Sequence, residues 1–149
     1  MQLRFSVSPH RPSDRAGLRD IFPEIYEEYA GRLRRHLLLV ARTRRRVIGV
    51  LFLQWYEEAC YFDPAVTRYA EIHEVHVHPD FRDRGVATGL VKRALQEATR
   101  RGCEAVYLVT DDFNAPARRL YERSGFAAHN VVIRYKKTLT SSGRPRAPR

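Results

Sequence analysis

Residues 78–90 read HPDFRDRGVATGL, and this short stretch says most about how the chain folds. It follows a β-rich run and leads into a helical pattern, so we predict a turn between a strand and a helix. A helix that begins at a glycine leaves main-chain N–H groups unpaired and presents the positive end of its dipole. Gly85 and Ala87 are small enough for a phosphate to approach the backbone, and Arg82 and Arg84 add positive charge. The turn therefore predicts a pyrophosphate site, although it matches neither GxxxxGK[ST] nor GxGxxG.

The elements on either side of this turn form a strand–helix–strand unit. The run Tyr69–Val77 has the composition of a strand and is closed by His78-Pro79. A helix is predicted from about Gly85 to Arg101, where Gly102 ends it. Ala105–Thr110 is the next expected strand, and a connection of this length favours a right-handed crossover between parallel strands. The buried face of the helix is expected to comprise Val86, Leu90, Ala94 and Ala98.

A second motif, NAPARRLYERSGF at residues 114–126, predicts a short helix. Asn114 is a good N-cap, and the helix is expected over Ala115–Arg123. Tyr121 follows Asn114 by two helical turns, so both side chains can face one ligand. A purely packing role for Tyr121 against the sheet is the alternative. Further strands are expected near Phe126 and over Val131–Leu139.

The N-terminal part predicts a strand, a helix and a β-hairpin. The first strand is expected over Gln2–Val7, and Ser13 is expected to cap a helix that Pro23 kinks or splits. Leu37–Arg42 and Val47–Gln54 are β-rich runs joined by a short basic turn, the pattern of a hairpin. The apolar stripe of the helix comprises Leu18, Ile21, Phe22, Ile25 and Tyr29.

Length and composition predict one domain over residues 1–139, followed by a disordered basic tail at residues 140–149. The longest apolar run, Val47–Leu53, is far too short to span a bilayer. The first residues lack the pattern of a secretory signal, and Cys60 and Cys103 show no metal-ligand spacing. We therefore expect a cytoplasmic protein with reduced thiols and no membrane partner.

Charge is distributed unevenly along the middle of the chain. Residues 57–80 carry six acidic side chains and one basic, whereas residues 81–101 carry six basic side chains and two acidic. This order is expected if one segment binds an anionic cofactor and its neighbour attracts a cation. The net charge of +10 also suggests a nucleic-acid partner, but the chain has no aromatic–basic alternation and no zinc or helix-turn-helix signature. Nucleic-acid binding is the weaker hypothesis.

Taken in order, Arg82-x-x-Gly85-x-Ala87, Asn114, Leu120-Tyr121-Glu122 and Gly125-Phe126 resemble the GNAT superfamily of N-acetyltransferases. The hairpin is similar to the family's second and third strands, so the resemblance covers roughly residues 2–139. It implies an α/β fold with a mixed, mostly antiparallel sheet of six to seven strands, flanked by helices and built around a parallel strand–helix–strand unit. It also implies acetyl-CoA as co-substrate and a primary amine as acceptor.

The resemblance assigns a role to each part of the site. The pantetheine arm would pair with the backbone at Val75 and Val77, and the pyrophosphate would lie on the turn. Tyr121 would protonate the departing thiolate, which is a modest base because a thiol has a pKa of about 8.5. Asn114 would contact the cofactor or an ordered water. The implied cofactor-binding residues are Val75, Val77, Arg82, Arg84, Gly85, Val86, Ala87, Thr88, Asn114 and Tyr121.

An acceptor amine must lose a proton before it attacks, because a free amine has a pKa of roughly 10. Glu74 is our first choice for the group that takes this proton, since it lies on the strand that would display the thioester. The alternatives are Glu71, His73, His76, or a merely structural Glu74. Regular alternation puts Glu74 and His76 on one face and His73 on the other, unless a bulge, common in the family, breaks it. Because His73, His76 and His78 cannot converge along a regular strand, no metal site is expected.

These observations predict an acyltransferase that binds acetyl-CoA and an amine acceptor together and transfers the acetyl group by direct attack. The acceptor would be a small molecule or a protein amine, and the acidic block favours a cationic one. A homodimer is possible. The alternatives are a non-catalytic acyl-CoA-binding protein and a basic nucleic-acid-binding module.

Overall fold

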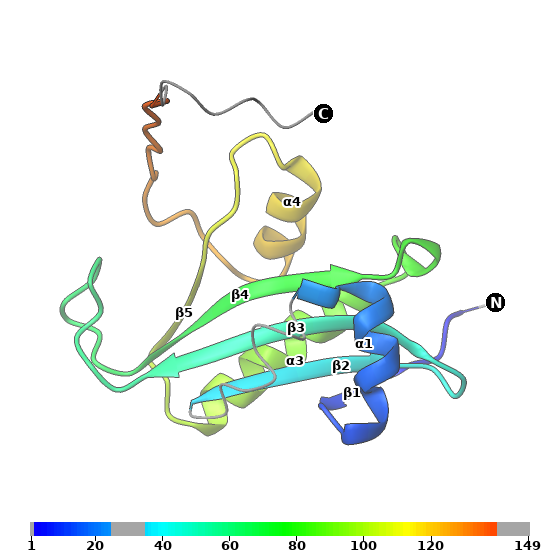
Figure 1. The fold of residues 1–149 in the computed structure, drawn as a ribbon. Helices are drawn as coiled ribbons and strands as arrows, with labels where there is room; N and C mark the ends of the chain where they lie inside the picture. The colour runs from blue at the N-terminus through cyan, green and yellow to red at the C-terminus, as the bar shows by residue number, and fades with distance from the viewer. Residues whose placement is uncertain (1, 25–34, 140–149) are drawn as a thin grey trace.

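The computed structural model describes residues 2–24 and 35–139, which contain one five-stranded sheet with helices on both faces (Figure 1). The strands are β1 (Ser6–Pro9), β2 (His36–Arg42), β3 (Val47–Tyr56), β4 (Tyr69–Val77) and β5 (Ala105–Leu108). They lie in sequence order, antiparallel from β1 to β4, and only β5 runs parallel to its neighbour. The described helices are α1 (Arg15–Ile21), α3 (Val86–Arg100) and α4 (Ala115–Arg123), with the 3₁₀ turns η1 (Pro12–Asp14) and η2 (Pro79–Phe81).

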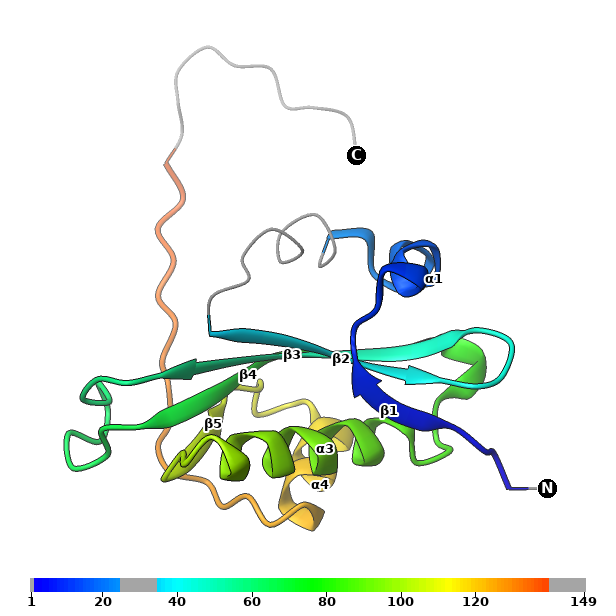
Figure 2. The same cartoon turned by 90° about the horizontal axis from the view of Figure 1, so that it is seen from below.

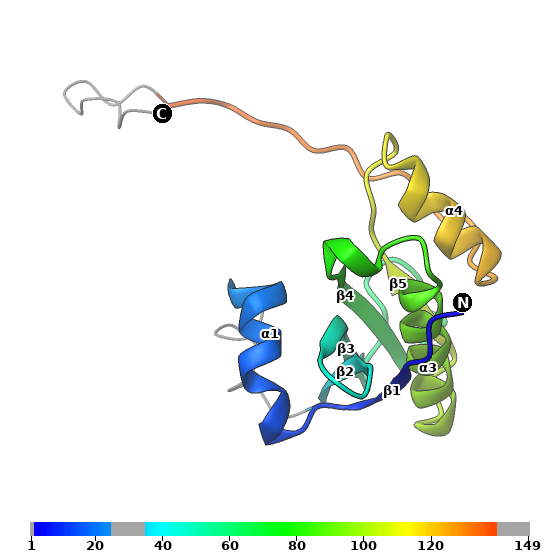
Figure 3. The same cartoon turned by 90° about the vertical axis from the view of Figure 1, so that its right-hand side faces the viewer.

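The helices lie on opposite sides of the sheet. α1 covers one face and α3 crosses the other, as Figures 2 and 3 show from two directions. α3 joins β4 to β5, so the predicted parallel strand–helix–strand unit is confirmed. α4 lies on the α3 side of the sheet (Figures 2 and 3).

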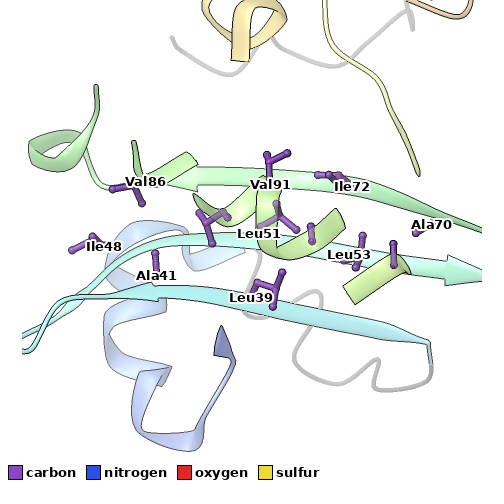
Figure 4. Close-up of a cluster of buried hydrophobic side chains, with 12 residues drawn as sticks. Leu39, Ala41, Ile48, Leu51, Leu53, Ala70, Ile72, Val86 and Val91 are labelled. Carbon is purple, nitrogen blue, oxygen red and sulfur yellow. The ribbon is translucent and has the colours of Figure 1, made fainter. Parts of the chain in front are cut away.

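The main core lies between the sheet and α3 (Figure 4). The predicted buried face of this helix is confirmed, because Val86, Leu90, Ala94 and Ala98 are all buried. Gly49 of β3 allows the close approach. A Cβ at this position would lie 3.0 Å from Val86 Cγ1 and 3.1 Å from Leu90 Cδ1. Burying one such side chain stabilises the fold by roughly 1.5–3 kcal/mol, so the helix is held firmly with its first turn beside the end of β4.

A smaller core lies between α1 and the other face of the sheet, where Leu18 is buried among side chains of β2 and β3. An ion pair beside it ties three elements together. Arg42 Nε donates to Asp14 Oδ1 at 2.6 Å, and Arg42 Nη1 donates to Ser8 Oγ at 2.6 Å. Burial opposes ionisation of Asp14, but the hydrogen bonds from Arg42 hold the pKa of this carboxyl below its usual value.

The hairpin and the strand 69–77 are confirmed, but the first strand was placed too early. β1 begins at Ser6 rather than Gln2 and continues through Pro9. The register explains the shift, since β1 pairs with β2 only from Ser6, opposite Arg42, to Pro9, opposite Leu39. Proline is tolerated at position 9 because β1 is an edge strand, so the main-chain N–H that proline lacks is not needed for pairing.

The start of the first helix also differs from the prediction. Ser13 is not its N-cap, because η1 includes Ser13 and the N-cap of α1 is Asp14. The predicted break is confirmed, since α1 ends at Ile21, before Pro23. Ile25 and Tyr29, the rest of the predicted stripe, lie outside the described residues.

The prediction of six to seven strands was wrong in the C-terminal part. Residues 126–139 form no strand, although strands were expected near Phe126 and over Val131–Leu139, and β5 ends at Leu108 rather than Thr110. A β-prone pattern forms a strand only where a sheet edge and packed neighbours receive it. Here the side chains of Ile133 and Tyr135 are exposed, with no packing to hold them in a ladder. The predicted disordered tail lies outside the described residues.

Candidate functional site

The second half of β4 has one edge that β5 does not cover (Figure 1). β5 pairs with β4 only from Tyr69 to Ile72, whereas β4 continues to Val77. On its other side, β4 stays paired with β3 as far as Gly49, opposite Val77. Residues 74–77 therefore have β3 partners on one edge and no β5 partner on the other.

Val75 and Val77 direct their main-chain groups toward this edge. His78 N–H donates to Ile48 O of β3 at 2.9 Å, and main-chain groups alternate in direction along a strand. The N–H and C=O groups of Val75 and Val77 therefore point away from β3. Arg82 Nε donates to Val77 O at 3.3 Å, in agreement with this direction. Such an edge can pair with a ligand that carries amide groups.

The turn after β4 offers a helix N-terminus suited to an anion. Gly85 is the N-cap of α3 and has φ +79, in the left-handed region that favours glycine. The first main-chain hydrogen bond of α3 joins Gly89 N–H to Gly85 O at 3.0 Å. The N–H groups of residues 86–88 therefore have no acceptor within the helix. A Cβ on Gly85 would meet no atom within 4 Å, and Arg82 and Arg84 are exposed beside it. This donor set fits a pyrophosphate.

A β-bulge in β4 gathers titratable side chains on the α1 face of the sheet. Glu74 lies opposite Phe52 and Ile72 lies opposite Leu53, so His73 is an extra residue in β4. The His73 ring lies 5.6 Å from the ring of Phe52, which belongs to the core on the α1 side. Regular alternation would have put His73 on the opposite face. The side chains gathered by the bulge are Glu71, His73, Glu74 and His76.

Together with Tyr56 of β3, these four side chains form two groups. In the first group, His76 Nε2 lies 2.8 Å from Glu74 Oε2. The His76 ring stacks on Phe22, with a centroid distance of 3.8 Å and an interplanar angle of 14°. The second group is held by contacts of 3.4 to 3.5 Å and comprises Tyr56, Glu71 and His73. The candidate bases therefore share one face but belong to separate clusters.

Tyr121 of α4 reaches the same region from the other side of the β4 edge. It packs against the main core, and its ring meets Phe126 edge-on at 5.9 Å. Burial raises the pKa of Tyr121, and the negative charge of Glu74 raises it further. The phenol therefore keeps its proton at neutral pH and lies within electrostatic reach of Glu74.

Asn114 holds the start of α4. Its Oδ1 accepts a hydrogen bond from Ala117 N–H at 3.3 Å, so the predicted N-cap is confirmed. Asn114 is exposed at the start of α4. Its contact with a cofactor stays a prediction.

The acetyltransferase (GNAT) family profile matches residues 6–126, which extend from β1 to the residue Phe126 beyond α4. The chain belongs to the GNAT family. An uncharacterised N-acetyltransferase of Methanocaldococcus jannaschii is 44% identical over 63 residues, or 42% of this chain and 28% of that protein. A mycothiol acetyltransferase of Corynebacterium aurimucosum is 31% identical over 87 residues, or 58% of this chain and 27% of that protein. The alignments thus cover less than a third of these relatives.

Solved structures share the GNAT fold. An aminoglycoside N-acetyltransferase in complex with CoA matches with a TM-score of 0.73 at 18% identity, covering 90% of this chain and 95% of that one. An acetyltransferase of Trypanosoma brucei matches with a TM-score of 0.71 at 18% identity, covering 90% of this chain and 100% of that one. A transcriptional regulator of Bacillus halodurans gives 0.71 at 21% identity, covering 90% and 100% of the two chains. At these identities the likeness concerns the fold alone.

The acidic block of this GNAT chain divides into two parts with different surroundings. Glu57 lies 3.6 Å from Arg35 and 3.5 Å from Arg68, so arginines balance its charge. Glu71 and Glu74 lie instead on the α1 face beside the uncovered β4 edge. Glu57 and these two carboxylates therefore have different electrostatic surroundings.

Two aromatic residues near the site were missed by sequence analysis. Phe22 was assigned to an apolar helical stripe, but it also stacks on His76. Tyr56 lay beyond the predicted end of its strand at Gln54, whereas β3 continues to Tyr56. The aromatic pair that follows Gln54 was the available signal, because aromatic residues favour strands.

Two classes of site find no support in the described part of the chain. Residues 2–24 and 35–139 bring together no three His, Cys, Asp or Glu side chains that could hold a metal ion. Over the same ranges, no helix has the length and apolar character needed to cross a membrane.

Proposed function

We propose that this GNAT chain is an acetyl-CoA-dependent N-acetyltransferase that transfers an acetyl group to a primary amine. One observation carries the proposal: the uncovered edge of β4 leads from Glu74, whose charge acts on Tyr121, to the turn at Gly85, where the start of α3 offers free N–H groups. A ligand with a pyrophosphate at one end and a thioester at the other matches this order of groups.

Acetyl-CoA would be held by β4 and the start of α3. The main chain of Val75 and Val77 would pair with the amides of the pantetheine arm. The pyrophosphate would accept hydrogen bonds from the first turn of α3 and from Arg82 and Arg84. Bound acetyl-CoA would supply the acetyl group as an activated thioester. The remaining cofactor-binding assignments are Gly85, Val86, Ala87, Thr88, Asn114 and Tyr121.

The side chains would then move two protons. Glu74 takes one proton from the acceptor ammonium, which leaves a neutral nitrogen able to attack the acetyl carbon directly. As the new C–N bond forms and the C–S bond breaks, Tyr121 Oη gives its proton to the departing sulfur. The nitrogen loses its second proton to solvent, from which Tyr121 is reprotonated. No covalent bond to the enzyme forms, so positioning supplies much of the rate enhancement.

The acceptor would be a cationic amine, either a small molecule or a protein amine. Glu71 and Glu74 favour positive charge at the site. Aminoglycosides belong among the amines to be tested because a structural neighbour is named for them. Cytoplasmic location also belongs to this proposal.

A turnover screen with acetyl-CoA tests the proposal. Release of CoA thiol should be measured with a panel of peptides, polyamines, aminoglycosides and small metabolic amines, and products identified by mass spectrometry. We expect acetylation of at least one amine. Acetyl-CoA binding without turnover across the panel would favour the non-catalytic acyl-CoA-binding alternative, and absence of binding would contradict both.

A further inference from the structure

Glu74 is one half of a closely held pair. His76 Nε2 and Glu74 Oε2 lie 2.8 Å apart, the distance of a charge-assisted hydrogen bond. Both side chains are about one-third exposed, at 31% for His76 and 36% for Glu74. They are reachable by a substrate but partly shielded from water, so the contact is stronger than one on an open surface.

The contact determines where a proton lies on the imidazole. Both oxygens of a carboxylate are acceptors, so a hydrogen bond requires the proton to be on His76 Nε2. In the neutral imidazole Nδ1 then carries the lone pair. The pair can therefore take a further proton either on the carboxylate or on Nδ1 of the ring.

The surroundings hold this arrangement in place. The Phe22 ring stacks on His76 at 3.8 Å and limits rotation of the imidazole. Opposite the pair on β3 lie Val50 and Phe52, neither of which titrates. Among residues 2–24 and 35–139, the charge of Glu74 acts on Tyr121 of α4, and Tyr56, Glu71 and His73 lie in a separate cluster on the same face of the sheet.

We propose that His76 positions Glu74 and shares the proton that Glu74 takes from the acceptor amine, so that the two side chains work as one base. The inference rests on the proposed function, because it concerns the deprotonation step. In that step only the N–H bond of the ammonium breaks, and its proton and positive charge pass to the pair.

This role has a consequence that a lone carboxylate would not produce. An imidazole binds a proton at higher pH than a carboxylate does. If the two side chains share the proton, we therefore expect the basic form to persist to lower pH in a variant that keeps Glu74 but lacks the imidazole. The acidic limb of the kcat/KM profile reports the loss of the basic form in the free enzyme.

The first experiment compares pH profiles of kcat/KM for wild type, His76→Gln and His76→Phe. Glutamine can still donate a hydrogen bond to Glu74 but cannot take up a proton, whereas phenylalanine keeps only the ring stack. We expect the acidic limb to move to lower pH by about one unit or more in both variants, toward the range of a lone carboxylate. kcat should fall further in His76→Phe, by about tenfold, because Glu74 loses its orienting partner. Lower rates with an unmoved limb would overturn the proposal and leave His76 a structural residue.

The second experiment needs no acceptor. Nitrogen-15 spectra of the imidazoles should show the Nε2–H tautomer for His76 in wild type and a mixture of tautomers in Glu74→Gln. Glu71→Gln is the matched control, since Glu71 lies 3.4 Å from His73, and it should leave the His76 tautomer unchanged. A mixture of tautomers in the wild type would contradict the hydrogen bond between Glu74 and His76 and with it the proposal. If amines are acetylated but neither readout moves, the proposed function stands and this inference fails, whereas absence of turnover removes both.

Discussion

At the scale of single residues, the proposed mechanism relies on the proton of Tyr121, which would be given to the departing thiolate. Burial and the charge of Glu74 both raise the pKa of Tyr121, so the hydroxyl is fully protonated at neutral pH. We expect Tyr121→Phe to lower kcat by roughly 10²-fold, since general acid catalysis contributes about that much. Affinity for acetyl-CoA, measured by calorimetry, should change little because the ring still packs against the core. Wild-type kcat in this variant would reduce Tyr121 to packing.

The pKa of Glu97 is shifted in the opposite direction to that of Tyr121, because this buried carboxylate is surrounded by arginines. It is 2% exposed, and it accepts hydrogen bonds from Arg93 at 3.0 Å, from Arg100 at 2.5 Å and from Arg101. Burial would raise the pKa of Glu97, but the arginines hold it below its usual value. A depressed pKa means that the stabilisation is present above the unfolded value of about 4.3 and is lost as pH falls below it.

Glu97→Gln should therefore lower the free energy of unfolding by about 2 kcal/mol at pH 7, because the buried hydrogen bonds lose their charge. The difference from wild type should shrink at pH 3. Urea denaturation at the two pH values measures this. Glu122→Gln is a suitable control, because Glu122 is exposed and its ion pair with Arg118 is long, at 3.8 Å. Its effect should therefore be much smaller. An equal loss at both pH values would show that packing, rather than charge, makes Glu97 important.

At the scale of elements, the turn between β4 and α3 should control cofactor binding. Arg84→Glu reverses a charge beside the helix N-terminus, and Gly85→Glu adds both a charge and a side chain where φ is +79. We expect each change to weaken acetyl-CoA binding by about tenfold or more, measured by calorimetry on folded variants. Arg44→Glu in the exposed β2–β3 turn makes the same change of charge elsewhere and should leave affinity nearly unchanged. Unaltered affinity in both folded turn variants would remove the assignment.

Elements with strong local signals were predictable from sequence. The strand 69–77 ends where His78-Pro79 stops it, and α3 runs from just after Gly85 to just before Gly102. In each case the residues that determine the boundary lie within the element or next to it. Glycine supplies a positive φ, and Pro79 begins the 3₁₀ turn that follows the strand.

Features that depend on distant partners were not predictable. The bulge at His73 was raised only by the family resemblance, because it depends on the register between β3 and β4 and nothing in residues 69–77 alone requires it. The pattern at residues 131–139 resembles a strand, yet no sheet edge receives it. The contact of Phe22 with His76 joins the end of α1 to β4, across more than fifty residues of sequence. Local periodicity carries no information about such pairings.

At the scale of the whole molecule, overall charge and local charge act in opposite directions. A net charge of +10 favours an anionic cofactor but repels a cationic amine. The fold reduces this conflict by placing Glu71 and Glu74 on the α1 face and leaving the arginine-rich turn at the far end of β4. Acceptor and cofactor would then approach from regions of opposite sign.

This separation predicts a salt-sensitive KM for the acceptor. Glu71→Gln removes a carboxylate on the α1 face, so KM for a cationic amine should rise by about threefold at low ionic strength. The effect should diminish in 0.5 M salt, where the screening length falls to a few ångströms, about 4–5 Å. Glu57→Gln is the matched control, because Arg35 and Arg68 already balance Glu57 and its removal should leave KM unchanged. Steady-state kinetics at the two ionic strengths, on whichever amine is acetylated fastest, make the comparison. Equal shifts of KM in both variants would mean that the acidic residues act through general surface charge. No shift of KM in either variant would mean that the acceptor is recognised by its shape rather than its charge.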